Sequence, residues 1–229
     1  MSYFILSEEK NEKSVESFHI HGTDALITFI IPTVGSDSLC HTLQSLLDQT
    51  LPKWKAIVMF VGCFPTSSTL EQMLQDQRFL PLFIHTRIKG KKEVRNHGFP
   101  LVATPWIGFV EEEDRLHPRY VASLRTEQQI TPHADVILFR RVQNSTILPS
   151  GNYFQWKEEQ VGSSFAMKST LIREGFVFGS SETEEDTLLQ CMVGRNKIVV
   201  LSPFIMYYVQ GTPPLPHPYP SLHRVHMYS

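Results

Sequence analysis

The chain has 229 residues, of which 41% are hydrophobic and 19% are charged, and its formal net charge is −2. This composition is ordinary for a folded globular protein, and the near-neutral charge excludes the general electrostatic attraction that brings nucleic acid to a basic protein. The three cysteines, Cys40, Cys63 and Cys191, stand apart and match no C-x-x-C spacing, which argues against both a disulfide framework and a structural zinc site.

Apolar runs alternate with amphipathic stretches through the first part of the chain. The runs are rich in β-branched and aromatic residues and lack polar alternation, which is typical of strands buried on both faces of a parallel sheet. Between the first two runs, leucines recur at the spacing that places them on one face of a helix. We expect strands at residues 25–31, 55–61, 79–85, 106–110 and 134–140.

The alternation ends after Arg141, where residues 142–160 predict a loop or a hairpin. Further strands are expected at residues 164–168, 197–202 and 204–209. Strands that alternate with helices predict the α/β class, with a mostly parallel central sheet flanked by helices. We expect one domain at residues 23–210, between a flexible N-terminal arm at 1–22 and a C-terminal tail at 211–229 that contains proline and histidine.

Four consecutive acids, Glu111 to Asp114, come directly after the apolar run "WIGFV". In open α/β sheets, ligands bind beside the carboxyl ends of the strands. Position alone leaves two interpretations open. One is a solvated turn whose charges complement the dipole of the next helix, and the other is a site where crowded carboxylates coordinate a divalent cation or have raised pKa values. The burial of the strand favours a site.

Several segments of the chain resemble the successive motifs of family 2 glycosyltransferases with the GT-A fold. They are "ITFIIPTVGSDS", "RNHGFPLVATPWIGFVEEEDRLHP", and "GSSFAMKSTLIREGF" followed by "ETEED". The family typically shows an "IPT-aromatic-N" strand end, an "ARN-x-G" helix, a "D-x-D-D…P" acid motif and a later "G-x-ED" motif. The resemblance extends over roughly residues 25–210, as counted along the sequence. It implies a single GT-A-like domain with a Rossmann-like nucleotide-binding half.

The resemblance implies a surface that binds a nucleoside diphosphate sugar. Pro32 and Thr33 match the strand end that contacts the nucleoside, and Arg95 and Asn96 match the pair that lies close to the nucleotide. Gly62 matches the glycine of a "D-D-G-S" segment that the family often has after its second strand. Apolar residues stand where the two aspartates of that segment would be, so the resemblance does not imply a uridine donor.

The resemblance also implies the roles of the acids. Glu111 and Glu113 occupy the two carboxylate positions of "D-x-D", with Asp114 as the acid that follows. By this match Glu113 is the main ligand of Mn²⁺ or Mg²⁺, Glu111 is a metal or nucleotide contact, and Asp114 contacts donor or acceptor. Glu185 and Asp186 match the later "ED" pair, of which Asp186 would be the general base. The alternative for this pair is a simple decoration of a helix N-terminus.

The implied function is an inverting, metal-dependent glycosyltransferase that transfers a sugar to a hydroxyl-bearing acceptor, such as a glycan, a protein or a small molecule. The physical chemistry agrees, because a nucleoside diphosphate leaves with negative charge that a hard divalent cation offsets. Two alternatives remain. One is a non-catalytic nucleotide-sugar-binding or glycan-binding module of the same fold. The weaker one is a nucleotidyltransferase, whose glycine-rich phosphate loop "IPTVGSDS" matches only poorly.

Other features have simpler interpretations. Lys89, Lys91 and Lys92 could add positive charge near the phosphates, although an ordinary solvated charge run is favoured. The tail histidines His217, His223 and His226 could supply an extra metal ligand, although exposed tail histidines are favoured. The sequence has no signal-peptide pattern and no apolar run near the ~20 residues of a spanning helix, so we expect a cytoplasmic protein without a transmembrane segment. It predicts no particular oligomeric state.

Overall fold

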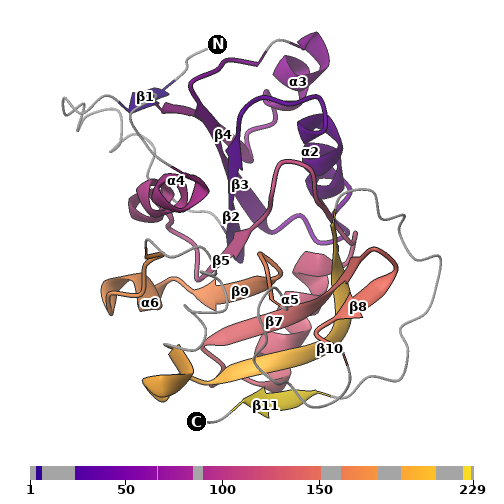
Figure 1. Ribbon diagram of the computed structural model, residues 1–229, viewed down its shortest axis with the longest axis vertical. Helices are drawn as coiled ribbons and strands as arrows, with labels where there is room; N and C mark the ends of the chain where they lie inside the picture. The colour runs from indigo at the N-terminus through magenta and orange to yellow at the C-terminus, as the bar shows by residue number, and fades with distance from the viewer. Residues whose placement is uncertain are drawn as a thin grey trace.

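The protein is built around one β-sheet, with helices packed on both of its faces (Figure 1). The computed structural model describes residues 4–6, 24–65, 67–84, 90–150, 161–179, 192–209 and 224–227. Within these residues the sheet has eleven strands. The arrangement confirms the predicted α/β class, with a mostly parallel central sheet flanked by helices.

The sheet has the strand order β1-β4-β3-β2-β5-β9-β7-β10-β11, with β6 paired to β10 and β8 paired to β7. The strands from β1 to β5 in this order are parallel, whereas β9 runs antiparallel between β5 and β7. The strands are β1 (Phe4–Leu6), β2 (Ile27–Thr33), β3 (Trp54–Val61), β4 (Phe79–Ile84), β5 (Trp106–Phe109), β6 (Arg115–Leu116), β7 (Val136–Gln143), β8 (Thr146–Leu148), β9 (Phe165–Lys168), β10 (Val199–Tyr208) and β11 (Val225–Met227).

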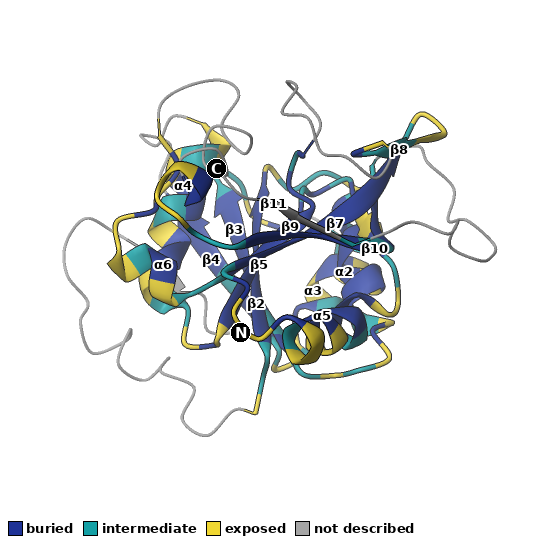
Figure 2. Cartoon of the chain, turned by 90° about the horizontal axis from the view of Figure 1, so that it is seen from below, coloured by how far each residue is buried: buried dark blue, intermediate teal, exposed yellow. Residues whose placement is uncertain are grey.

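Two groups of helices cover the two faces of the sheet, and Figure 2 shows the buried strands between them. One face packs against α2 (Leu39–Leu47), α3 (Ser68–Met73) and α5 (Tyr120–Ile130). The other packs against α4 (Lys91–Gly98), the 3₁₀ helix η1 (Phe99–Leu101) and α6 (Thr170–Arg173). None of the helices in the described part of the chain is long and apolar enough to cross a membrane.

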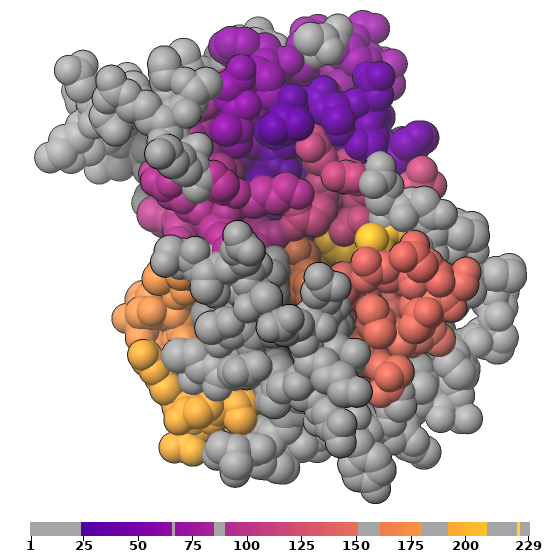
Figure 3. Space-filling view, viewed as in Figure 1, coloured from indigo at the N-terminus to yellow at the C-terminus, as the bar shows by residue number. Residues whose placement is uncertain are grey.

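The two halves of the chain lie at opposite ends of the molecule (Figure 3). They meet where β5, the last parallel strand of the first half, pairs with β9 from the second half. Because β9 is antiparallel to both of its neighbours, β7 and β10 again point the same way as β5. The carboxyl ends of β2, β3, β5, β7 and β10 therefore share one edge of the sheet, and this edge is where a ligand site is expected.

The strands expected between residues 25 and 140 are confirmed as β2, β3, β4, β5 and β7. The structure corrects one prediction in the second half. The two strands expected at residues 197–202 and 204–209 are one strand, β10 (Val199–Tyr208). Its pairing with β7 shifts register between Leu201 and Tyr207. Pro203 lies in this stretch and has no N–H to donate to the ladder, which explains why pairing is interrupted without ending the strand.

The predicted loop or hairpin after Arg141 begins as a hairpin. β7 and β8 are joined by Asn144 and Ser145, whose φ angles are 49° and 63°. Two successive residues with positive φ are typical of a type I′ turn, whose twist matches that of the two strands. Residues 151–160 lie outside the described part of the chain.

Two strands fall within the segments that we expected to be a terminal arm and a tail. β1 pairs with the edge strand β4, and β11 pairs with the first residues of β10. In this pairing the backbone of His226 lies opposite Val200, near the start of β10, whereas the predicted acid site lies near its end at Tyr207. The separation along β10 is roughly 20 Å, too far for His226 to ligate a metal there. His217 and His223 lie outside the described residues.

Arg224 ties the C-terminal segment to helix α5. Its guanidinium donates to both carboxylate oxygens of Glu127 at 2.9 Å each, and Ser202 donates to the same carboxylate at 3.0 Å. Glu127 is fully buried, so removal of the guanidinium leaves a buried charge with too few donors. We expect Arg224→Ala to lower the free energy of unfolding by about 2 kcal/mol in urea denaturation. The matched control is Arg125→Ala, on the exposed side of α5, and equal losses in the two variants would contradict this role.

Candidate functional site

The four acids expected to form a site lie in a turn between β5 and β6, which we call the acid turn (Glu111–Asp114). The turn follows the carboxyl end of β5, directly beside the end of β2. Its side chains differ in their surroundings, since Glu112 and Asp114 are buried whereas Glu111 and Glu113 are partly exposed. Four adjacent acids are tolerated here because three of them accept hydrogen bonds from donors in other segments of the chain.

Glu112 fastens the acid turn to the end of β2. Its Oε2 atom accepts hydrogen bonds from the Thr33 hydroxyl at 2.6 Å, from the Val34 N–H at 3.1 Å and from the Ser36 N–H at 3.4 Å. The Thr33 hydroxyl also accepts the Gly35 N–H at 2.8 Å. A carboxyl group that is only 7% exposed needs such donors in place of the water that it has lost. Glu112 therefore joins the segment after β5 to the segment after β2.

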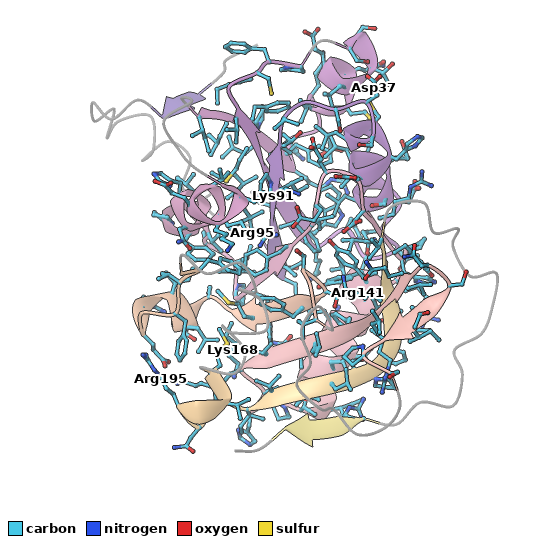
Figure 4. The ribbon with its side chains drawn as sticks, in the orientation of Figure 1. Asp37, Lys91, Arg95, Arg141, Lys168 and Arg195 are labelled. Atoms are coloured by element: carbon cyan, nitrogen blue, oxygen red, sulfur yellow. The ribbon has the colours of Figure 1, made fainter. Side chains whose placement is uncertain are left out.

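Glu111 lies in a network with two cations from α4 (Figure 4). Its Oε2 atom accepts a hydrogen bond from Lys91 Nζ at 2.8 Å. Its Oε1 atom accepts from the Arg95 guanidinium and, at 2.8 Å, from the Ser163 hydroxyl. Ser163 also accepts from Arg95 at 2.9 Å, which closes a ring of three side chains. Both oxygens of Glu111 are thus engaged with protein donors.

The charges around Glu111 predict a pH dependence of stability. Burial alone would raise the pKa of Glu111, but Arg95 and Lys91 outweigh it, so the pKa lies below its ordinary value of 4.5. A lowered pKa in the folded state stabilises the fold above the unfolded-state pKa, and this contribution disappears as the pH falls through the folded-state value. Glu111→Gln should therefore be less stable than the parent protein at pH 7, and the difference should shrink as the pH falls below about 4.5.

Urea unfolding between pH 3 and pH 7 measures this difference. Glu71→Gln, at an exposed position on α3, is the matched control that removes a carboxylate without removing an ion pair. Stability curves that stay parallel for Glu111→Gln and the parent protein across this range would contradict the network.

Tyr207 supports the acid turn from β10. Its hydroxyl accepts the Glu111 N–H at 3.2 Å and lies close enough to Asp114 for a hydrogen bond to that carboxylate. Burial, together with the charges of Asp114 and Glu111, raises the pKa of Tyr207 well above its ordinary value. The hydroxyl therefore stays neutral and can donate to Asp114. Thr42 of α2 adds a second support, since its hydroxyl lies 2.7 Å and 2.8 Å from the carbonyl oxygens of Glu112 and Asp114.

Glu113 differs from the other three acids. It is partly exposed, and within the described residues we find no hydrogen bond or ion pair to its carboxylate. It lies close enough to Lys91 to raise the pKa of that lysine, together with Glu111 and against the effect of burial. In the described part of the chain, no cluster of three or more His, Cys, Asp or Glu side chains forms a preassembled metal site. One available carboxylate nevertheless suits Mg²⁺ or Mn²⁺, which bind substrate phosphates and water beside one or two protein ligands.

Arg95 and Asn96, both expected near a nucleotide, have different surroundings. The side chain of Arg95 is 3% exposed, and its guanidinium lies 5.7 Å from the ring centre of Phe109 and 5.1 Å from that of Phe178. The Asn96 amide donates to the Phe178 carbonyl at 2.8 Å and accepts the Phe178 N–H at 3.0 Å. Asn96 therefore holds the segment that leads toward Glu185, and a contact between Asn96 and a nucleotide stays a prediction.

The other predicted donor-binding residues lie at the same edge of the sheet. Pro32 and Thr33 end β2 in buried positions, and Gly62 follows β3 with a φ of 66° that favours glycine. The structure thus brings these residues together with Arg95 and the acid turn. The remaining predicted residues Glu185, Asp186 and Lys89 lie outside the described part of the chain.

Sequence reasoning assigned no role to Glu112, Ser163 or Tyr207. Glu112 stands between two motif positions, Ser163 lies in a resembling segment for which no role of that residue was implied, and Tyr207 belongs to an expected strand. Lys91 was favoured as a solvated charge, whereas the structure pairs it with Glu111. The one available signal was the excess of negative charge in the acid turn, which required cations or donors from elsewhere in the chain.

Comparison with known proteins identifies the fold that carries these residues. No family model matches the sequence, and no curated protein matches it. Solved structures do match it. One is residues 1–349 of S. aureus TarS in complex with UDP-GlcNAc, which superposes with a TM-score of 0.65 at 15% sequence identity. The match covers 83% of this chain and 60% of the TarS chain. Another is the mannosyltransferase PcManGT from Pyrobaculum calidifontis in complex with GDP-Man and Mn²⁺, which superposes with a TM-score of 0.61 at 12% sequence identity. That match covers 86% of this chain and 62% of the PcManGT chain. The chain thus spans about three fifths of these structures, and it has the GT-A-like glycosyltransferase fold.

Proposed function

We propose that the protein is an inverting, metal-dependent glycosyltransferase that transfers a sugar from a nucleoside diphosphate sugar to a hydroxyl acceptor. The observation that carries the proposal is the acid turn at the carboxyl end of β5. Three of its acids are engaged with protein donors, while Glu113 has no hydrogen-bonded partner in the described residues and lies near Lys91 of α4. The nucleotide sugars bound in TarS and PcManGT, and the Mn²⁺ in PcManGT, support this assignment.

Glu113 would hold the Mn²⁺ or Mg²⁺ ion, and Lys91 and Arg95 would add positive charge close by. The ion supplies Lewis acid chemistry, because it offsets the charge of the departing nucleoside diphosphate. Glu111 would become a second contact once Lys91 moved from it to the phosphates. The side chain of Lys91 is 56% exposed, so such a movement displaces little packing. Arg95 is fixed by its burial and would remain with Glu111.

Asp186 would be the general base, with Glu185 beside it. It would take the proton from the acceptor hydroxyl while that oxygen bonds to the anomeric carbon and the bond from this carbon to the diphosphate oxygen breaks. A single displacement of this kind inverts the configuration at that carbon. The contacts between Asn96 and Phe178 support the assignment, because they hold the chain beside Arg95 at a point eight residues before Asp186.

A donor screen tests the proposal. Thermal unfolding is followed with UDP-, GDP-, CDP- and ADP-sugars, each with and without Mn²⁺, and release of nucleoside diphosphate is then measured for every donor that stabilises the protein. We expect Mn²⁺-dependent stabilisation together with slow release of nucleoside diphosphate. Stabilisation without hydrolysis or transfer would favour a binding module of the same fold. The absence of any effect from every donor would contradict both functions.

A further inference from the structure

Exposed apolar side chains follow the carboxyl ends of β2 and β3, next to the acid turn. Val34 is 65% exposed and Phe64 is 61% exposed, more than any other large hydrophobic residue in the described part of the chain. The Phe64 ring stacks on Phe83 of β4 at 4.6 Å between centroids, and Phe83 stacks on Phe60 of β3 at 5.2 Å. We call these three rings the aromatic platform (Phe60, Phe64 and Phe83). Phe64 is the outermost of the three rings, since it stacks on Phe83 while most of its side chain remains exposed.

The platform lies where the base of a donor would be if the acid turn held its diphosphate. β5, β2 and β3 are consecutive neighbours in the sheet, so the end of β3 is two strand spacings, roughly 10 Å, from the end of β5. That distance suits the separation between the terminal phosphate and the base of a nucleoside diphosphate. Gly35 brings the two loops into contact, since a Cβ on it would lie 3.2 Å from Cys63 Sγ. Val34 and Phe64 therefore border one surface.

The chemistry of this surface favours stacking over recognition of the base edge. Residues 33–36 and 60–65 contain no Asp, Glu, Asn or Gln, and the Thr33 hydroxyl is already bonded to Glu112. Bases are distinguished mainly by hydrogen bonds to their edges, whereas an aromatic ring stacks on every base because each has a π-face. A surface of this composition can hold a base tightly while discriminating little among bases.

We propose that the base of the donor stacks on the open face of Phe64 beside Val34, so that the protein binds nucleoside diphosphates with little discrimination among bases. This inference rests on the proposed function, because it requires the diphosphate to lie at the acid turn. It makes Phe64 a determinant of affinity for the nucleoside part of the donor and not for its phosphates.

Calorimetric titration of the full chain with UDP, CDP, GDP and ADP in the presence of Mn²⁺ tests the proposal. We expect the four dissociation constants to agree within tenfold, with the purine nucleotides bound at least as tightly as the pyrimidine ones. Phe64→Ala should weaken all four by about fivefold to a hundredfold, the range for loss of one stacked base. Inorganic pyrophosphate should bind the variant and the parent protein equally well.

Three further variants sharpen the comparison. Phe64→Leu keeps an apolar side chain but removes the ring, so it should weaken binding as the alanine variant does, whereas Phe64→Trp should retain it. Ile130→Ala removes an exposed apolar side chain from α5 and should change nothing. Asp37→Asn removes the exposed carboxylate that follows residues 33–36 in the sequence. The proposal gives this carboxylate no contact with the base, so all four affinities should stay unchanged.

The outcomes separate this inference from the proposed function. A preference for one base above tenfold, a loss below fivefold in Phe64→Ala, or a changed affinity in Asp37→Asn would overturn stacking on Phe64, while nucleotide binding itself would still support a donor site. Failure of the parent protein to bind any nucleoside diphosphate, with or without Mn²⁺, would instead overturn the proposed function. Because Phe64 is exposed, its variants should melt at the temperature of the parent protein, which shows that they are folded.

Discussion

Asp186→Asn is expected to slow sugar transfer by about 10²- to 10⁴-fold, the usual contribution of a general base, while the affinity for the donor stays nearly unchanged. The asparagine amide has almost the same shape as the carboxylate but cannot accept a proton from an acceptor hydroxyl. In the proposed displacement the diphosphate of the donor would lie on the opposite side of the reacting carbon from Asp186, so binding of the donor should not depend on this charge. Steady-state rates of transfer, together with calorimetric titration of the donor, measure the two effects separately.

Glu185→Gln is the matched control for this prediction, because it removes the adjacent charge and leaves the proposed base in place. We expect it to retain most of the transfer rate. If Asp186→Asn transferred sugar at the parent rate, the base would have to be another residue. If both variants lost donor binding, the pair would belong to the donor site and not to the acceptor side.

Glu113→Gln is expected to weaken Mn²⁺-dependent donor binding by about a hundredfold, since loss of even an outer partner of a metal ligand costs 10- to 100-fold in affinity. A neutral amide is a poor ligand for a hard divalent cation, and the other three acids of the turn are engaged with donors from the protein. Titration of the donor at several Mn²⁺ concentrations measures the effect. Pyrophosphate titrations in parallel show whether it is confined to the metal and the phosphates.

Glu113→Asp distinguishes the loss of charge from a change of length. It keeps the carboxylate but shortens the side chain by one methylene, as in the acid motif that the chain resembles. We expect Mn²⁺ dependence to persist in this variant. An unchanged affinity for Mn²⁺ in Glu113→Gln would refute the role of Glu113 as a ligand.

The strands, and the position of the acid turn at the carboxyl edge of the sheet, could be predicted because they depend on local pattern. An apolar run such as residues 25–31 indicates a buried strand wherever its partners lie, and the edge formed by the carboxyl ends of parallel strands is a general property of α/β sheets. The single strand at 199–208 was predicted as two, because Pro203 interrupts the pattern while the neighbouring strand carries the backbone through it.

The supports of the acid turn could not be predicted, because they join residues that are far apart in the chain. Thr33 and Glu112 are 79 positions apart, and Asn96 and Phe178 are 82 apart. The pattern around each residue reports how deeply it is buried but not which group it meets. A match to a family motif does not supply this information either, since the motif position of Asn96 gave no indication of its two hydrogen bonds to the backbone of Phe178.

The hydrogen bonds of Glu112 and the packing of Thr42 also have a kinetic consequence. They immobilise the acid turn and the Thr33–Ser36 loop in the folded protein, before any ligand arrives. The conformational entropy of ordering these two loops is therefore lost during folding, so it does not subtract from the affinity for a donor. If a donor binds here as proposed, its association should require no reordering of these two loops.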